Sequence, residues 1–160
     1  IWRFSATVPN QTFANGFRYA TGIRHAVGIT WNTKANSLYA MQHGRDQLHD
    51  HWPEFYTAKQ SAELPAEEFF KVEEGDDFGW PYCYYDWQKK QKILNPEYGG
   101  NGDSIGRCAS VKRPLLGFPG HWAPNAVTFY NGNQFPVRYK GGAFIAFHGS
   151  WNRAPFPQQG

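Results

Sequence analysis

The chain has 160 residues, of which 41% are apolar and 18% aromatic, a composition typical of a folded globular protein rather than a disordered one. Its formal net charge is +3, but the 16 lysines and arginines are scattered without a run or stripe, which argues against nucleic-acid binding. No apolar segment approaches the ~20 residues that cross a bilayer, and no targeting segment begins the chain.

Short strands are predicted in the first third of the chain. Apolar and alternating runs favour strands at residues 1–4, 26–31 and 37–42, and Asn-, Gly- and Pro-containing turns separate them. The one helix that the sequence predicts lies over residues 65–70, where Pro65 stands near the first turn. Glu67 and Glu68 suit the positive end of such a helix.

A polar loop follows the third predicted strand. It gathers three imidazoles and two carboxylates in a stretch with one glycine: His43, Asp46, His49, Asp50 and His51. Loops at strand ends often carry ligands in β proteins. Two interpretations stay open for the histidines, because imidazole is a common transition-metal ligand but loop histidines are also often simply solvated.

The middle of the chain is loop-like. Residues 73–86 are acidic, then glycine-bearing, then aromatic, which is typical either of an ordered loop near a ligand or of aromatic packing over a sheet edge. Residues 87–113 predict a long surface excursion. Cys83 and Cys108 either stay as free thiols or form a disulfide, which would contribute about 3 kcal/mol and suit a periplasmic or secreted protein.

The last third of the chain repeats the pattern of the first. Residues 125–131 echo 26–32, and residues 143–149 echo 38–44, each time as strand, turn, strand and His-Gly. The two units lie further apart than the ~40–50 residues of a compact propeller repeat, so long loops must be inserted. The predicted fold class is all-β, part of a β-propeller. We expect residues 1–160 to form one incomplete propeller domain whose open blade edges favour self-association.

Four ordered motifs, at residues 21–29, 43–46, 78–82 and 142–153, resemble the sorbosone dehydrogenase branch of the soluble glucose dehydrogenase family. Members of that family are six-bladed propellers that use pyrroloquinoline quinone and calcium. The resemblance implies about two to three blades here. It also implies that the full-length protein oxidises a sugar or a sugar-derived aldehyde or alcohol and passes electrons to an external acceptor.

The resemblance also implies a cofactor pocket. Arg24 matches the family arginine at the quinone edge, where a planar cation stabilises developing negative charge. It is the one catalytic residue expected here, because the family's general-base histidine lies in an earlier blade, so this chain alone is expected to be inactive. Further cofactor contacts are expected from His25, His43, His121, Asn152 and Arg153. Trp122 and Trp151 are expected either as ring walls or in the core.

Calcium is expected beside the cofactor. The backbone carbonyls of Gly44 and Arg45 occupy the family's calcium position, and Asp50 or Asp46 would add a carboxylate, with the Phe78 carbonyl a weaker candidate. The alternative function is a non-catalytic carbohydrate- or protein-binding propeller module. A lectin, however, does not need the set of Arg24, Gly44–Arg45 and Arg153.

Overall fold

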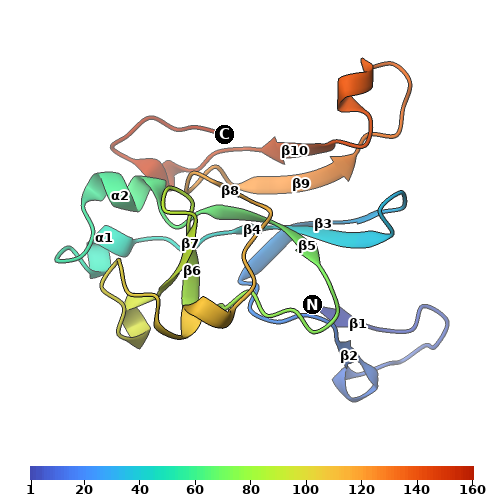
Figure 1. Cartoon of the computed structure of the whole chain (residues 1–160), viewed down its shortest axis with the longest axis horizontal. Helices are drawn as coiled ribbons and strands as arrows, with labels where there is room; N and C mark the ends of the chain where they lie inside the picture. Colours follow the sequence, from blue (N-terminus) through green and yellow to red (C-terminus); the bar gives the residue numbers. More distant parts are fainter.

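The computed structural model describes residues 1–160 and is built mainly from short antiparallel strands (Figure 1). The strands are β1 (Trp2–Arg3), β2 (Phe17–Arg18), β3 (His25–Asn32), β4 (Ser37–His43), β5 (Glu67–Val72), β6 (Cys83–Asp86), β7 (Gln91–Leu94), β8 (Leu116–Phe118), β9 (Pro124–Phe129) and β10 (Ala143–Phe147). The helices are α1 (Leu48–His51) and α2 (Ala58–Glu63), with 3-10 turns at Phe13–Asn15, Pro96–Tyr98, Gly106–Ser110, Val137–Tyr139 and Trp151–Arg153. None of these helices has the length and apolar character needed to cross a membrane.

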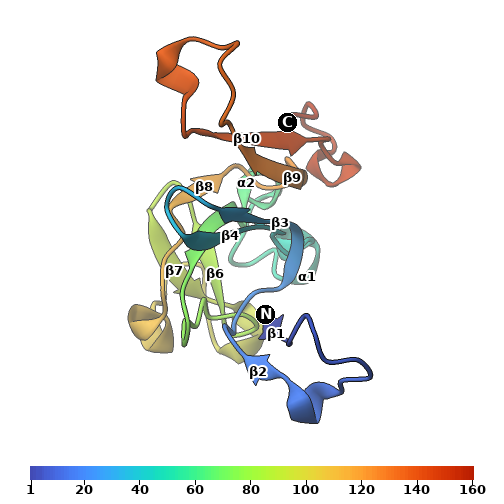
Figure 2. The same ribbon diagram turned by 90° about the vertical axis from the view of Figure 1, so that its right-hand side faces the viewer.

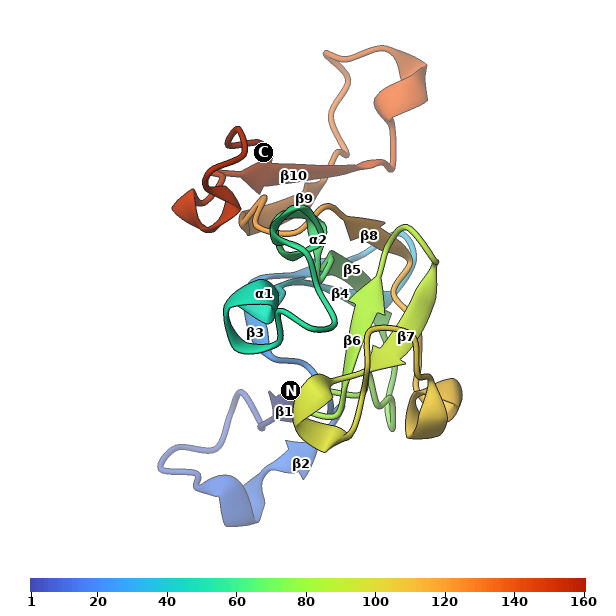
Figure 3. The same ribbon diagram turned by 90° about the vertical axis from the view of Figure 1, so that its left-hand side faces the viewer.

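A four-stranded sheet in the order β3-β4-β5-β8 occupies the centre of the molecule. Its strands follow one another along the chain except that the β6–β7 hairpin is inserted between β5 and β8. Such a meander is the unit from which propeller blades are built. The two-stranded sheets β1–β2 and β9–β10 lie on opposite sides of it (Figures 2 and 3). The chain therefore holds one four-stranded sheet flanked by smaller ones, rather than two or three full blades.

The helix predicted over residues 65–70 is wrong, because this segment belongs to strand β5. Phe70 pairs with Ala40 of β4, and Phe69 pairs with Leu116 of β8. Pairing on both edges satisfies the backbone of β5, and this long-range effect outweighs the helix-start signal of the acidic residues. The helices lie earlier instead, and α2 is capped by Thr57, whose side chain accepts a hydrogen bond from the Gln60 backbone N–H.

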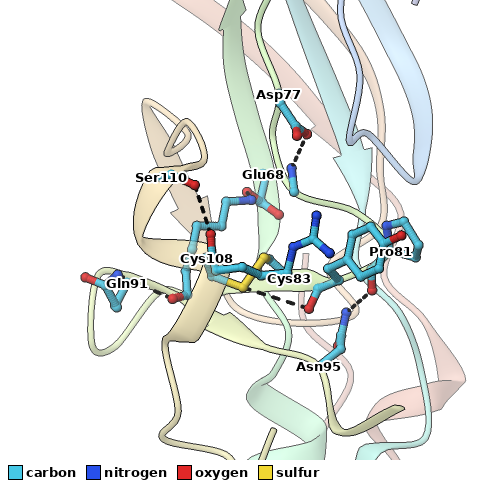
Figure 4. Close-up of a disulfide and its surroundings, with 12 residues drawn as sticks. Glu68, Asp77, Pro81, Cys83, Gln91, Asn95, Cys108 and Ser110 are labelled. Atoms are coloured by element: carbon cyan, nitrogen blue, oxygen red, sulfur yellow. Dashed lines mark hydrogen bonds and ion pairs between the residues drawn. A yellow bond between two sulfur atoms is a disulfide. The ribbon is translucent and has the colours of Figure 1, made fainter. Parts of the chain in front are cut away.

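Residues 87–113 are more ordered than a surface excursion, because they include β7 and two 3-10 turns. A disulfide joins Cys83 of β6 to Cys108, so the free-thiol alternative is excluded (Figure 4). The aromatic run before β6 serves packing at Phe78, which is fully buried with its ring centroid 4.2 Å from that of Phe70.

Two hydrophobic clusters cover the two faces of the central sheet. Consecutive side chains of a strand point to opposite faces, so Phe70 packs with Ala20 and Phe78, whereas Phe69 packs with Met41 and Val127. The cluster that contains Phe69 packs the central sheet against β9 and β10. This packing brings the loop after β4 against the start of β9 and the loop after β10, where most of the predicted site residues lie.

Candidate functional site

A hollow of about 190 Å³ lies where these segments meet. Its walls are Arg24, His43, Gly44, Asp46, Glu67, His121, Ala123, His148, Ser150 and Asn152. It thus gathers six of the residues predicted for the cofactor and its metal: Arg24, His43, Gly44, Asp46, His121 and Asn152. Four other predicted residues, His25, Arg45, Asp50 and Arg153, do not line it.

Arg24 is held at the wall of this hollow by both its backbone and its side chain. Its backbone N–H donates to Gln42 Oε1 at 2.7 Å, and its Nη1 donates to the Gly44 carbonyl at 2.7 Å. Its Nη2 lies 4.0 Å from Asp46 Oδ2. Because only one guanidinium N–H is used within the protein, the others remain available to a ligand.

Gly44 and the buried carboxylate of Glu67 form the floor of the site. Glu67 accepts hydrogen bonds from the Gly44 N–H at 2.9 Å and from the Ala123 N–H at 3.2 Å. A Cβ at position 44 would lie 2.9 Å from the Ala66 carbonyl oxygen, so this close approach requires glycine. Burial raises the pKa of Glu67, although both backbone hydrogen bonds oppose the shift.

His121 and Asp46 form a charged pair inside the hollow. His121 Nε2 lies 2.9 Å from the Ser61 carbonyl, and its Nδ1 lies 3.2 Å from Asp46 Oδ1. Both partners can accept, so the protonated ring would donate from both nitrogens. Burial alone lowers the pKa of His121, but the hydrogen bonds with Asp46 and Ser61 outweigh it and raise the pKa.

The Asp46 carboxylate is correspondingly stabilised in its charged form. The hydrogen bond from His121 lowers the pKa of Asp46, and this effect outweighs burial, which raises it. Asn152 Nδ2 also donates to Asp46 Oδ1 at 2.7 Å. Asp46 lies in the loop after β4. It therefore connects Asn152, in the segment after β10, with His121, in the loop before β9.

His43 lines the hollow with its ring held by the backbone. Its Nε2 donates to the Pro124 carbonyl at 2.9 Å. The ring of His25 lies next to it, with 5.3 Å between the ring centroids, but His25 is exposed and lies outside the hollow. His148 also lines the hollow, and its Nδ1 donates to the carbonyl of the adjacent Gly149.

Arg153 lies away from the hollow, and its side chain is only 2% exposed. Its Nε donates to Pro157, its Nη1 to Ala62 and Gly120, and its Nη2 to the Glu63 carboxylate at 2.6 Å. The structure thus places this predicted cofactor ligand in a buried clamp, because four of its five side-chain N–H groups are bound by the protein.

Arg45 and Asp50 do not line the hollow of Gly44, although Arg45 lines a smaller cleft together with Arg24 and Gly44. The Arg45 side chain pairs with Glu97 and stacks over Trp52 at 4.7 Å. Asp50 lines a second hollow of about 130 Å³, which shares only Asn152 with the first. The structure therefore places Asp50 in a different hollow from the Gly44 carbonyl.

The two tryptophans differ in their surroundings. Trp122 packs against Phe118 and Phe147, in agreement with the core alternative. Trp151 is 80% exposed and lines the second hollow. Neither tryptophan forms a wall of the hollow that holds Arg24.

No cluster of three or more His, Cys, Asp or Glu side chains in residues 1–160 is arranged to hold a metal ion. His49 Nδ1 is bound to the Tyr56 carbonyl at 2.6 Å, and His51 packs against Trp52. The transition-metal interpretation of the loop histidines is therefore not supported.

Gln42 and Glu67 hold the site residues in place, but the sequence alone predicts only a strand at Gln42 and a helix start at Glu67. One signal in the sequence could have identified them: both are polar residues in segments otherwise rich in strand-forming residues. A polar side chain buried in a strand requires a specific partner, so such a position indicates a defined contact.

Comparison with known proteins places the chain in a family. The TrAA12-like family model matches residues 2–158. Two curated relatives each match over 84% of the chain: an uncharacterised protein of Borreliella burgdorferi, 31% identical over 135 residues, and the pyrroloquinoline quinone-dependent pyranose dehydrogenase of Coprinopsis cinerea, 27% identical over 154 residues. The chain spans 31% of the first relative and 19% of the second.

A solved structure supports the same assignment at the level of the fold. The calcium structure of the family AA12 carbohydrate-active enzyme of Trichoderma reesei aligns with a TM-score of 0.68 and 21% identity, over 94% of this chain and 38% of the enzyme. The match supports the predicted fold, a mainly β chain that corresponds to part of a larger propeller. Together with the family model, it shows that the chain belongs to the TrAA12-like family.

Proposed function

We propose that the chain supplies part of the cofactor site of a pyrroloquinoline quinone-dependent dehydrogenase that oxidises a sugar or a sugar-derived aldehyde or alcohol. The observation that carries this proposal is the pairing of Arg24 with the Gly44 carbonyl in a polar hollow. The pyranose dehydrogenase relative of Coprinopsis cinerea supports the choice of cofactor and of substrate class.

The chemistry of the hollow fits the cofactor and calcium. Pyrroloquinoline quinone carries three carboxylates and an ortho-quinone, which call for a planar cation such as the guanidinium of Arg24. Calcium prefers oxygen ligands, including backbone carbonyls. The Gly44 carbonyl, the Asp46 carboxylate and the Ser150 hydroxyl supply such oxygens at this hollow.

Each residue has a separate task in this proposal. When bound, the quinone would accept the hydride of the substrate. Arg24 would bind the quinone edge and stabilise negative charge there, because its remaining N–H groups are free to donate. His121 and Asn152 would hold Asp46 in place, and Glu67 would hold Gly44 through its backbone N–H. His43, when its ring is neutral, would present Nδ1 as an acceptor.

The surroundings of the site are part of the same proposal. The Cys83–Cys108 disulfide supports an extracytoplasmic location, periplasmic or secreted, because disulfides persist in oxidising compartments. The substrate would be a small sugar, and an external acceptor would take the electrons. The general base is expected outside these 160 residues, so cofactor binding rather than turnover is the property to measure.

Thermal unfolding of the protein tests this proposal against the carbohydrate-binding alternative. A ligand that binds only the folded state stabilises it by about 2.7 kcal/mol at a hundred times its Kd. We expect pyrroloquinoline quinone with calcium to raise the Tm and a panel of neutral sugars to leave it unchanged. A Tm that rises with sugars alone and not with the quinone would favour the binding module, for which the exposed Trp151 offers a stacking face.

A further inference from the structure

We propose that Lys92 of the inserted β6–β7 hairpin is a positioning residue for Arg24, acting through Glu68 and Gln42. This inference rests on the proposed function for its consequence in cofactor binding, but not for its structural content. It assigns a task to a buried ion pair that lies outside the hollow.

The four residues form a continuous chain of short hydrogen bonds. Lys92 Nζ donates to Glu68 Oε2 at 2.6 Å, and Gln42 Nε2 donates to Glu68 Oε1 at 2.8 Å. Gln42 Oε1 in turn accepts the backbone N–H of Arg24 at 2.7 Å. Lys92 and Glu68 are almost completely buried, with side chains 1% and 3% exposed, and Gln42 is also buried.

The direction of this chain is fixed by chemistry. The Arg24 backbone N–H can only donate, so the Gln42 amide must turn its oxygen toward it. Its NH₂ group then faces Glu68 Oε1, which accepts, while Glu68 Oε2 accepts from Lys92, so a carboxylate serves both donors. Lys92 supplies the positive charge that keeps a carboxylate there without exposure to water.

An ion pair is not the only arrangement that could fill this position in the core. A buried ion pair is often no more stabilising than apolar side chains of the same volume. Here Lys92 reaches between the rings of Phe70 and Tyr85, at 5.8 Å and 5.9 Å from their centroids, a space that an apolar side chain could fill. Its specific contribution is the orientation of the Gln42 amide.

The hairpin that carries Lys92 thereby becomes part of the site. Glu68 and Cys83 line the same small cleft as Arg24 and Gln42, and Figure 4 shows Glu68 near the disulfide. The hairpin inserted between β5 and β8 would thus set the main-chain position of the candidate cofactor arginine. Its disulfide would hold the hairpin in place.

The test compares three variants of the whole chain. Lys92→Met removes the counter-ion and keeps the length of the side chain. The double variant Lys92→Met with Glu68→Gln removes both charges but restores an amide oxygen that can accept from Gln42. Tyr56→Phe is the control, because it removes the buried hydrogen bond between Tyr56 and Tyr84 at 3.1 Å without touching the four residues.

Two readouts are measured for each variant: hydrogen exchange of the Arg24 backbone amide and the Kd for pyrroloquinoline quinone with calcium. A buried polar group left without its partner changes such equilibria by about tenfold or more. We expect both readouts to change by about tenfold in Lys92→Met, to return to within about threefold in the double variant, and to stay unchanged in Tyr56→Phe.

The inference would be overturned if the Arg24 amide exchanged at the wild-type rate in a folded Lys92→Met variant. It would also be overturned if Tyr56→Phe changed that exchange rate as much as Lys92→Met does. If Lys92→Met does not fold, Gln42→Met tests the same link directly and must accelerate Arg24 exchange. If the wild-type protein does not bind the quinone, the proposed function fails, whereas the exchange readout still decides whether Lys92 positions Arg24.

Discussion

Arg24 Nη1 donates a hydrogen bond to the Gly44 carbonyl oxygen at 2.7 Å, so the candidate cofactor arginine is bound to the oxygen predicted to hold calcium. A carbonyl oxygen has two lone pairs and can serve both partners. The positive charge of Arg24 nevertheless opposes a second cation at this position. The two residues are therefore coupled, and the cofactor carboxylates would relieve the repulsion.

This coupling predicts opposite effects of Arg24→Ala on the two ligands. Without the quinone, the variant should bind calcium several-fold more tightly, because a repulsion of up to about 1 kcal/mol between partly exposed charges is removed. Calorimetric titration with calcium chloride measures the change, with Arg107→Ala as the control, since Arg107 stacks on Tyr82 away from the hollow. Equal calcium affinity in wild type and Arg24→Ala would count against a calcium site at Gly44.

The His121–Asp46 pair predicts a pH window of extra stability. The pKa of His121 is raised, so its contribution is complete below the unfolded value near 6.5 and is lost as the pH rises through the folded value. The pKa of Asp46 is lowered, so its contribution is present above 3.8 and is lost as the pH falls through the folded value. The pair therefore stabilises the fold most between about pH 4 and 6.5.

Asp46→Asn should remove this window. Because Asp46 is partly exposed, the expected effect is at most about 1 kcal/mol. Denaturant unfolding at pH 5.5 and pH 8.5 should show wild type losing stability relative to the variant as the pH rises. Parallel pH profiles of the two proteins would show that the pair does not titrate as described.

Removal of the disulfide should destabilise the chain without dismantling the central sheet. Cys83 and Cys108 are separated by 25 positions, for which the chain-entropy estimate gives a contribution of about 3 kcal/mol. The double variant Cys83→Ala with Cys108→Ala should unfold at correspondingly lower denaturant concentration. A loss below about 1 kcal/mol would mean that the hairpin is held mainly by its other contacts.

Arg153→Ala separates a structural role from a role in cofactor binding. The variant leaves the partly buried Glu63 carboxylate and three carbonyl groups without their donor, which should cost about 3 kcal/mol or more. Quinone affinity measured under conditions where the variant is still folded should stay within about threefold of wild type. A large loss of quinone affinity with little loss of stability would instead support the predicted contact between Arg153 and the cofactor.

The strands β3, β4, β9 and β10 were predictable from the sequence to within a few residues. Each combines β-branched or aromatic residues with a turn signal nearby, so local pattern and tertiary structure agree. The end of β4 and the loop after it, which the sequence predicts to carry ligands, contribute His43, Gly44 and Asp46 to the lining of the hollow.

Strand β5 and the role of Arg153 were not predictable in this way. Glu67 and Glu68 lie in a strand that pairs with β4 and β8, and their carboxylates bind groups far along the chain, at Ala123 and Lys92. Arg153 belongs to a motif that matches the family pattern, yet its side chain donates hydrogen bonds to backbone carbonyls. These carbonyls lie next to Arg153 only in the folded chain. Long-range partners of buried charges leave no periodic signal in a sequence.

The most direct test is calorimetric titration of the protein with pyrroloquinoline quinone, with calcium present and again after a chelator has removed it, beside Arg24→Ala and Arg107→Ala. The account predicts calcium-dependent binding that weakens about tenfold or more in Arg24→Ala, as expected for a lost charge-assisted hydrogen bond, and that is unchanged in Arg107→Ala. Absence of binding under both conditions, by protein shown to be folded, would contradict it.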